Sequence, residues 1–193
     1  MSSFAGLAEQ VRAAPPRLGR TRLVCIDGPA GSGKTTFAAR LAAALGGDVA
    51  VVHMDDVYAG WTLDGAHDRL TDAVLRPLAE GRPGIYHRYD WLTGRFDAAP
   101  TPVPVPDVLV VEGCGSCPRT VDGWTTLRIW VEAPAPLRLA RGLARDGEQE
   151  ADHWRRWQRE EAAHFAAEDT RARADLRVDG ADTVTDWAFV VLS

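Results

Sequence analysis

The chain has 193 residues, of which 46% are hydrophobic and 25% are charged, and its formal net charge is −5. These values are typical of one compact globular domain over residues 1–193, and the negative charge argues against a general nucleic-acid or membrane-surface binder. No apolar run approaches the length of a membrane span, and three cysteines with no secretory signal at the N-terminus predict a reducing, cytoplasmic location.

The first predicted element is a short amphipathic helix over residues 3–14. Its apolar side chains recur with helical spacing, and Pro15 and Pro16 end it. The residues expected on its buried face are Phe4, Leu7, Ala8 and Val11. A short apolar run at residues 23–26 then predicts a buried strand.

A phosphate-binding loop follows this strand. Residues 28–35 read Gly-Pro-Ala-Gly-Ser-Gly-Lys-Thr and fit the pattern G-x-x-x-x-G-K-[ST] of nucleoside-triphosphate enzymes. Glycines let the backbone turn tightly, so that successive N–H groups converge on a phosphate. Residues 36–45 are rich in helix formers, and the order strand, glycine loop, helix aims a helix N-terminus at an anion.

Two side chains of this loop predict ATP and Mg²⁺ as its ligands. Lys34 brings a cation to the β- and γ-phosphates, and Thr35 offers a hydroxyl to the magnesium ion. Lys34 is the only lysine among the 22 basic residues, and its compact ammonium fits such a loop where a planar guanidinium would not. The residues expected to contact the nucleotide are Gly28, Pro29, Ala30, Gly31, Ser32, Gly33, Lys34, Thr35 and Thr36.

The middle of the chain alternates between strand and helix patterns. A buried strand is predicted at 49–54, a helix at 67–80 that Pro77 kinks, a small hairpin at 81–96 and an extended, proline-rich connector at 98–106. The clearest remaining strand is 107–112.

The last third of the chain continues the alternation. We expect a strand at 127–131, helices at 134–145 and 152–173, a short strand at 176–178, and a strand or packed tail at 187–192. Alternating strands and helices predict an α/β fold: a parallel, doubly wound sheet with helices on both faces.

Acidic residues follow the predicted strands at the edge where such sheets bind ligands. Asp27 precedes the phosphate loop and could support it by accepting backbone N–H bonds. Glu112 is either a magnesium-associated carboxylate that works with Thr35 or a cap, and the apolar run before it favours magnesium. Asp55 is the preferred general base for phosphoryl transfer to a hydroxyl, with Asp56 as the alternative.

Cysteines, tryptophans and one histidine receive structural interpretations. Cys114 and Cys117 are read as two thiols in a loop, because no second Cys or Cys/His pair completes a zinc site. His53 is expected to be a hydrogen-bonded core residue. Trp154 and Trp157 should pack the last long helix onto the body. The tryptophans expected in the core are Trp124, Trp130 and Trp187.

Five ordered segments resemble the uridine kinase/phosphoribulokinase-like family of P-loop small-molecule kinases. They are the phosphate loop, Asp55-Asp-Val-Tyr58, Tyr89-Asp-Trp91, Glu112-Gly113, and Arg138-Leu-Ala-Arg141 with Arg145-Asp146. The resemblance spans residues 22–180, spread thinly. It implies a P-loop NTPase fold with an acceptor-side excursion at about 58–97 and a short helical lid at about 141–172.

The same resemblance implies roles for single residues. Asp55 matches the catalytic carboxylate and Glu112 the magnesium-associated acid, while lid arginines approach the transferring phosphate and stabilise its charge. The expected catalytic residues are Lys34, Asp55, Arg141 and Arg145. The expected acceptor-binding residues are Tyr58, Asp64, Tyr89 and Trp91, and the expected metal ligands are Thr35 and Glu112.

Two departures from the family bear on the acceptor. Uridine kinases carry a His a few residues after the Tyr-Asp-aromatic segment, where it contacts the nucleobase, and the matching position here is Gly94. The lid is also acidic at 147–150. Both features argue against uridine. Trp61 and Trp91 either pack in the core or stack on a flat acceptor.

The sequence thus predicts an ATP- and Mg²⁺-dependent kinase that transfers the γ-phosphate to a hydroxyl of a small molecule. A nucleoside-like compound is one candidate for this acceptor. A nucleoside monophosphate kinase is one alternative. Its acceptor is a phosphate, whose oxygen needs no general base, so its activity would not depend on Asp55. A slow nucleotide-hydrolysing switch is the other. We expect no nucleic-acid or membrane partner, and the oligomeric state is left open.

Overall fold

The computed structural model describes residues 1–181 and 185–192. Its centre is a seven-stranded sheet in the order β1-β9-β8-β7-β2-β6-β3. The strands are β1 (Ser2–Ser3), β2 (Arg22–Asp27), β3 (Val49–His53), β6 (Val108–Glu112), β7 (Thr125–Glu132), β8 (Leu176–Asp179) and β9 (Ala188–Val191). Strands β8, β7, β2, β6 and β3 run parallel, as predicted, whereas β9 is antiparallel to both β8 and β1.

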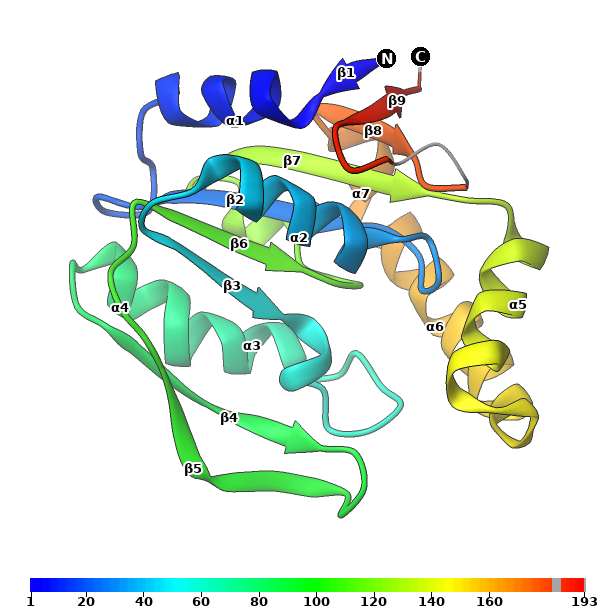
Figure 1. Cartoon of the computed structure of the whole chain (residues 1–193). Helices are drawn as coiled ribbons and strands as arrows, with labels where there is room; N and C mark the ends of the chain where they lie inside the picture. Colours follow the sequence, from blue (N-terminus) through cyan, green and yellow to red (C-terminus); the bar gives the residue numbers. More distant parts are fainter. Residues whose placement is uncertain (182–184, 193) are drawn as a thin grey trace.

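Helices cover both faces of the sheet (Figure 1). On one face, α1 (Phe4–Ala13) and α2 (Lys34–Leu45) pack against Val24 and Ile26 of β2. On the other, Leu23 and Cys25 of the same strand join a second core with the helical segment 66–79. Alternate residues of one strand point to opposite faces, so a strand buried on both sides reads as a continuous apolar run.

The predicted helix at 67–80 forms in three parts: α3 (Ala66–Leu70), a π-helical turn (Thr71–Leu75) and α4 (Arg76–Ala79). Pro77 is the second residue after the π turn. Proline has no N–H and its ring crowds the carbonyl four residues earlier, so a locally wider turn accommodates it.

The predicted hairpin is present as a separate two-stranded sheet of β4 (Gly84–Asp90) and β5 (Arg95–Val103). The connector predicted at 98–106 was placed wrongly over residues 98–103, because β5 continues to Val103. Pro100 and Pro102 pair with His87 and Ile85 in this ribbon. Each strand of a two-stranded sheet has one open edge, where a missing N–H costs no ladder bond.

The lid region consists of α5 (Ala135–Asp146), a 3₁₀ turn (Glu148–Glu150), α6 (Ala151–Glu168) and α7 (Thr170–Arg173). The single helix predicted at 152–173 is therefore broken at Asp169, which adopts a left-handed conformation with φ 52°. Figure 1 shows α5 and α6 side by side, projecting beyond the end of the sheet. None of the helices within residues 1–181 and 185–192 is long and apolar enough to span a bilayer.

One tryptophan prediction is wrong. Trp187, expected in the core, has 81% of its surface exposed. Its backbone carbonyl accepts the N–H of Phe4 at 3.1 Å, so the backbone docks at the sheet edge while the ring faces solvent. Trp130 is buried as expected, whereas Trp124 is only partly buried against the core.

Candidate active site

A cleft of ≈ 680 Å³ opens at the carboxyl ends of β3 and β6, between the phosphate loop and the lid. Parallel sheets bind ligands at this edge. Loop residues Ala30, Gly31, Gly33, Lys34, Thr35 and Thr36 line it, whereas Gly28, Pro29 and Ser32 do not. The other chemistry-bearing residues that line it are Asp55, Tyr58, Trp61, Trp91, Glu112, Cys114, Arg141, Arg145, Asp146, Glu150, Trp154 and Trp157.

The phosphate loop has the conformation that its glycines permit. Gly28, Gly31 and Gly33 all have positive φ, and α2 begins directly after Gly33. A Cβ at Gly31 would lie 2.5 Å from the carbonyl oxygen of Arg138, so close packing against α5 also requires glycine there. The N-terminus of α2 therefore faces the cleft, where its free N–H groups favour an anion.

Lys34 lies at the floor of the cleft with only 7% of its surface exposed. Its ammonium donates to the carbonyl of Pro29 at 2.9 Å and lies 3.7 Å from the Cys114 sulfur. Burial alone would lower the pKa of Lys34, but Cys114, Glu112 and the other acids around it outweigh burial and raise that pKa. Lys34 therefore carries its charge at neutral pH.

Thr35 and Glu112 meet as predicted. The Thr35 hydroxyl donates to Glu112 Oε1 at 3.1 Å, and the Nδ1 atom of His53 lies 2.6 Å from the same oxygen. His53 is hydrogen-bonded as predicted, but it is half-exposed and not a core residue, and its hydrogen bond to Glu112 raises its pKa. The described residues contain no cluster of three metal-binding side chains, but Mg²⁺ is usually held by one or two carboxylates together with substrate phosphates. A hydroxyl beside a buried carboxylate fits that requirement.

The two adjacent aspartates have different environments. Asp55 faces the cleft. Asp56 is turned toward the hairpin, where it accepts a hydrogen bond from Tyr86 at 3.0 Å and forms an ion pair with Arg88 at 3.0 Å. The structure thus places Asp55, and not Asp56, beside the phosphate loop. Partial loss of water raises the pKa of Asp55, nearby Glu112 adds to this, and Lys34 opposes it.

Four indole rings line the same cleft as the phosphate loop. Trp61 is at the centre, with ring centroids 5.8 Å from Trp91, 6.0 Å from Trp154 and 6.1 Å from Trp157. Trp91 donates from its indole nitrogen to the backbone carbonyl of Asp55 at 3.0 Å. Hairpin, loop and lid thus contribute to one aromatic surface next to Asp55. We call these four tryptophans the aromatic wall.

The other predicted acceptor residues are placed differently. Tyr58 lines the cleft, but its side chain is buried and its hydroxyl donates to the Cys114 carbonyl at 2.8 Å. Tyr89 packs behind Trp91, with centroids 5.3 Å apart, and is not among the lining residues. Asp64 is exposed outside the lining, and its backbone bonds to Thr62 and Arg69. The order of motifs along the chain does not reveal these side-chain directions.

Both predicted lid arginines line the cleft. Arg141 donates to the backbone carbonyls of Gly31 at 3.3 Å and Gly180 at 2.8 Å, which holds it near the phosphate loop. Arg145 forms an ion pair with Asp146 at 2.7 Å, and its guanidinium carbon lies 5.8 Å from the Trp154 ring centroid.

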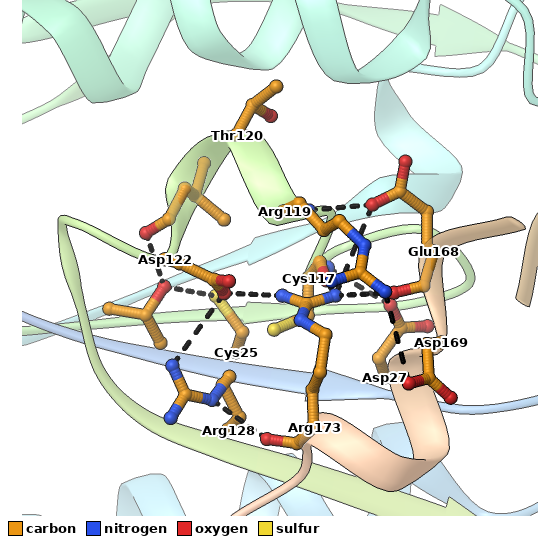
Figure 2. Close-up of polar contacts among 12 residues, drawn as sticks. Cys25, Asp27, Cys117, Arg119, Thr120, Asp122, Arg128, Glu168, Asp169 and Arg173 are labelled. Carbon is orange, nitrogen blue, oxygen red and sulfur yellow. Dashed lines mark hydrogen bonds and ion pairs between the residues drawn. The ribbon is translucent and has the colours of Figure 1, made fainter.

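The acid that precedes the phosphate loop is structural, as expected. Buried Asp27 accepts N–H bonds from Gly28 at 2.7 Å, Gly115 at 3.0 Å and Cys117 at 3.0 Å. Gly115 and Cys117 belong to the loop of residues 113–118. Figure 2 shows a second contact to this loop, where the Arg173 guanidinium donates to the Cys117 carbonyl at 3.3 Å and pairs with Asp122. These bonds lock residues 113–118 against the phosphate loop, with both cysteines as buried free thiols.

Two residues near the phosphate loop escaped sequence reasoning. Glu161 on α6 is buried and bonds to the loop backbone, and Cys114 contacts Lys34. The signal for Glu161 lay in helical spacing: Trp154, Trp157 and Glu161 fall on one stripe of α6, and all three are buried. A glutamate on the buried stripe of a helix requires a partner.

The contact between the lid helices leads to a stability prediction. A Cβ at Gly142 would collide with the ring of Trp154, so Gly142→Ala must displace that ring. We expect a loss of about 1–3 kcal/mol in the free energy of unfolding, measured by urea denaturation. Gly123→Ala is the control, since nothing lies within 4 Å of a Cβ there. Equal losses in both variants would contradict the packing described.

Comparison with models of known protein families and with curated proteins finds no match. Solved structures do match. A possible uridine kinase from Bacillus stearothermophilus is 21% identical, covers 90% of this chain and 96% of its own, and has a TM-score of 0.64. A candidate fructose transport system kinase from Silicibacter sp. TM1040 is 24% identical, covers 92% and 99%, and has a TM-score of 0.62. The protein YGR205w is 14% identical, covers 90% and 91%, and has a TM-score of 0.58. These likenesses confirm the predicted fold.

Proposed function

Starting from this P-loop kinase fold, we propose that the protein is an ATP- and Mg²⁺-dependent phosphotransferase whose acceptor is a hydroxyl of a small molecule. The observation that carries the proposal is the position of Asp55: it lies in the same cleft as Lys34, Thr35 and Glu112, while Asp56 is engaged elsewhere. Two of the three similar structures are described as kinases, which supports the same class of reaction.

In the proposed reaction, the acceptor oxygen bonds to the γ-phosphorus, the bond from that phosphorus to the β,γ-bridging oxygen breaks, and ADP leaves. The hydroxyl proton passes to Asp55. Lys34 and the loop N–H groups hold the β- and γ-phosphates, and Arg141 and Arg145 face the transferring group from the lid. Thr35 and Glu112 would hold Mg²⁺, which neutralises phosphate charge when bound.

The aromatic wall supports a particular class of acceptor. Trp61 and Trp91, the two of its rings that are not fully buried, offer flat, apolar surface beside Asp55. Gly94 provides no side chain where a base-reading His is expected. A site that lacks a hydrogen-bond partner for a base loses much of its discrimination. We therefore propose a neutral, hydroxyl-bearing acceptor with an aromatic or apolar part. Uridine and cytidine should be poor substrates.

An acceptor panel tests both proposals. ADP release would be followed with nucleosides, nucleoside monophosphates, sugars and aromatic alcohols at one ATP concentration. We expect the highest specificity constants for hydroxyl acceptors with a flat or apolar group. Preference for uridine over everything else would show that another residue replaces the missing His. Phosphorylation of monophosphates alone would favour a nucleoside monophosphate kinase, and turnover that no acceptor stimulates would favour a hydrolytic switch.

A further inference from the structure

Glu161 is a buried carboxylate that contacts the phosphate loop from the lid. It lies on α6, has 2% of its surface exposed, and accepts the backbone N–H of Ala30 through Oε2 at 2.8 Å. The same oxygen lies 3.4 Å from the Cys114 sulfur, whose single S–H has a second acceptor in the Gly28 carbonyl at 3.2 Å. An ionised side chain at this depth requires partners for both oxygens.

Arg138 of α5 is the partner of the other oxygen. Its Nη1 atom lies 2.9 Å from Glu161 Oε1 and 3.3 Å from the carbonyl oxygen of Ala30, while its Nε donates to Ala133 at 3.0 Å. The ion pair therefore forms hydrogen bonds with both the N–H and the C=O of Ala30 in the phosphate loop. Helix α5 also packs closely against the next residue of the phosphate loop, where Gly31 lies against the Arg138 backbone.

A stability role alone accounts poorly for this pair. Burying two charges costs about as much as their attraction returns, and apolar residues often stabilise such a site as well or better. What an apolar pair cannot do is donate to and accept from the Ala30 backbone. The chemistry that distinguishes Glu161 and Arg138 from apolar residues is thus directed at the phosphate loop.

We propose that Glu161 is a positioning residue for the nucleotide site: clamped by Arg138, its carboxylate fixes Ala30 and thereby the shape of the phosphate-binding loop. This inference rests on the proposed function, since it assumes that the loop binds a nucleotide. The same pair ties the loop to both lid helices. Because α6 carries Trp154 and Trp157, the pair also sets the position of these two tryptophans of the aromatic wall relative to the phosphate loop.

The test compares two neighbouring glutamates on α6. Glu161→Gln loses the charge and presents an amide where the carboxylate accepts from Ala30 and Arg138. Glu160→Gln is the matched control, because Glu160 is tied instead to Thr62 and Leu63 at 2.9 Å and 2.6 Å. With ADP and Mg²⁺ as the probe in calorimetric titration, we expect at least ~10-fold weaker binding for Glu161→Gln, the usual size of a lost charged hydrogen bond. The control should bind like the parent.

Thermal unfolding without ligand separates positioning from folding. Glu161→Asp keeps the charge but shortens the side chain, so it should retain most of the melting temperature and still lose ADP affinity. It also replaces Glu161→Gln if that variant does not fold. ADP affinity equal to the parent in folded Glu161→Gln or Glu161→Asp would overturn the inference. A parent protein that binds neither ADP nor ATP would instead overturn the proposed function beneath it.

Discussion

Lys34→Ala is expected to lower phosphoryl transfer by ~10²-fold or more and to weaken ATP binding, because it removes the cation that we propose faces the β- and γ-phosphates. The buried position of Lys34 sharpens this expectation. Its ammonium is held by the Pro29 carbonyl at 2.9 Å, at the floor of the cleft that the phosphate loop lines. Steady-state turnover and ATP titration measure the two effects.

Lys34→Arg separates charge from shape. It keeps the cation but replaces a compact ammonium with a planar guanidinium, for which the slot between Pro29 and Cys114 leaves little room. We expect it to fail nearly as severely as alanine. Arg76→Ala removes an exposed cation that pairs with Asp72, and it serves as the control. Turnover of Lys34→Ala within about threefold of the parent, well under ~1 kcal/mol, would refute the assigned role.

Local patterns predicted the central fold well. The strands at 23–26, 49–54 and 107–112 are apolar on both faces because helices cover both sides of the sheet, and such runs stand out in a sequence. The phosphate loop is equally local: its glycines, its lysine and the helix that follows are contiguous. Features set by neighbouring residues are therefore the ones that sequence reasoning recovers.

Features set by tertiary contact were missed. The break at Asp169 and the exposure of Trp187 depend on how the chain turns back toward the sheet, which composition does not encode. Likewise, Asp64 and Tyr89 were matched to the acceptor site by motif order, but side-chain direction places both outside the lining of the cleft. Glu161 reaches Ala30 across 131 positions of sequence.

Asp55→Asn is the second decisive variant, because it keeps the shape of the side chain and removes the proposed proton acceptor. We expect ATP affinity to be roughly retained and transfer to fall by ~10²-fold or more, the usual size of a general-base effect. The parent should also show an acid limb. The pKa of Asp55 is raised, chiefly by loss of water in the cleft, so the carboxylate forms only above the ordinary pH for aspartate and transfer rises with pH through that range. Asp55→Asn should lack this limb.

Asp56→Asn is the matched control, one residue away in the same 3₁₀ turn. Its carboxylate holds Tyr86 and Arg88 of β4 in the hairpin, so the variant should lower the melting temperature while transfer per folded molecule stays close to the parent. The reverse pattern, with transfer lost in Asp56→Asn and kept in Asp55→Asn, would move the base by one residue. Transfer that survives both variants would argue for a phosphate acceptor, whose oxygen carries no proton for a carboxylate to remove. The pair of variants therefore distinguishes a hydroxyl kinase from its nearest alternative before the acceptor itself is known.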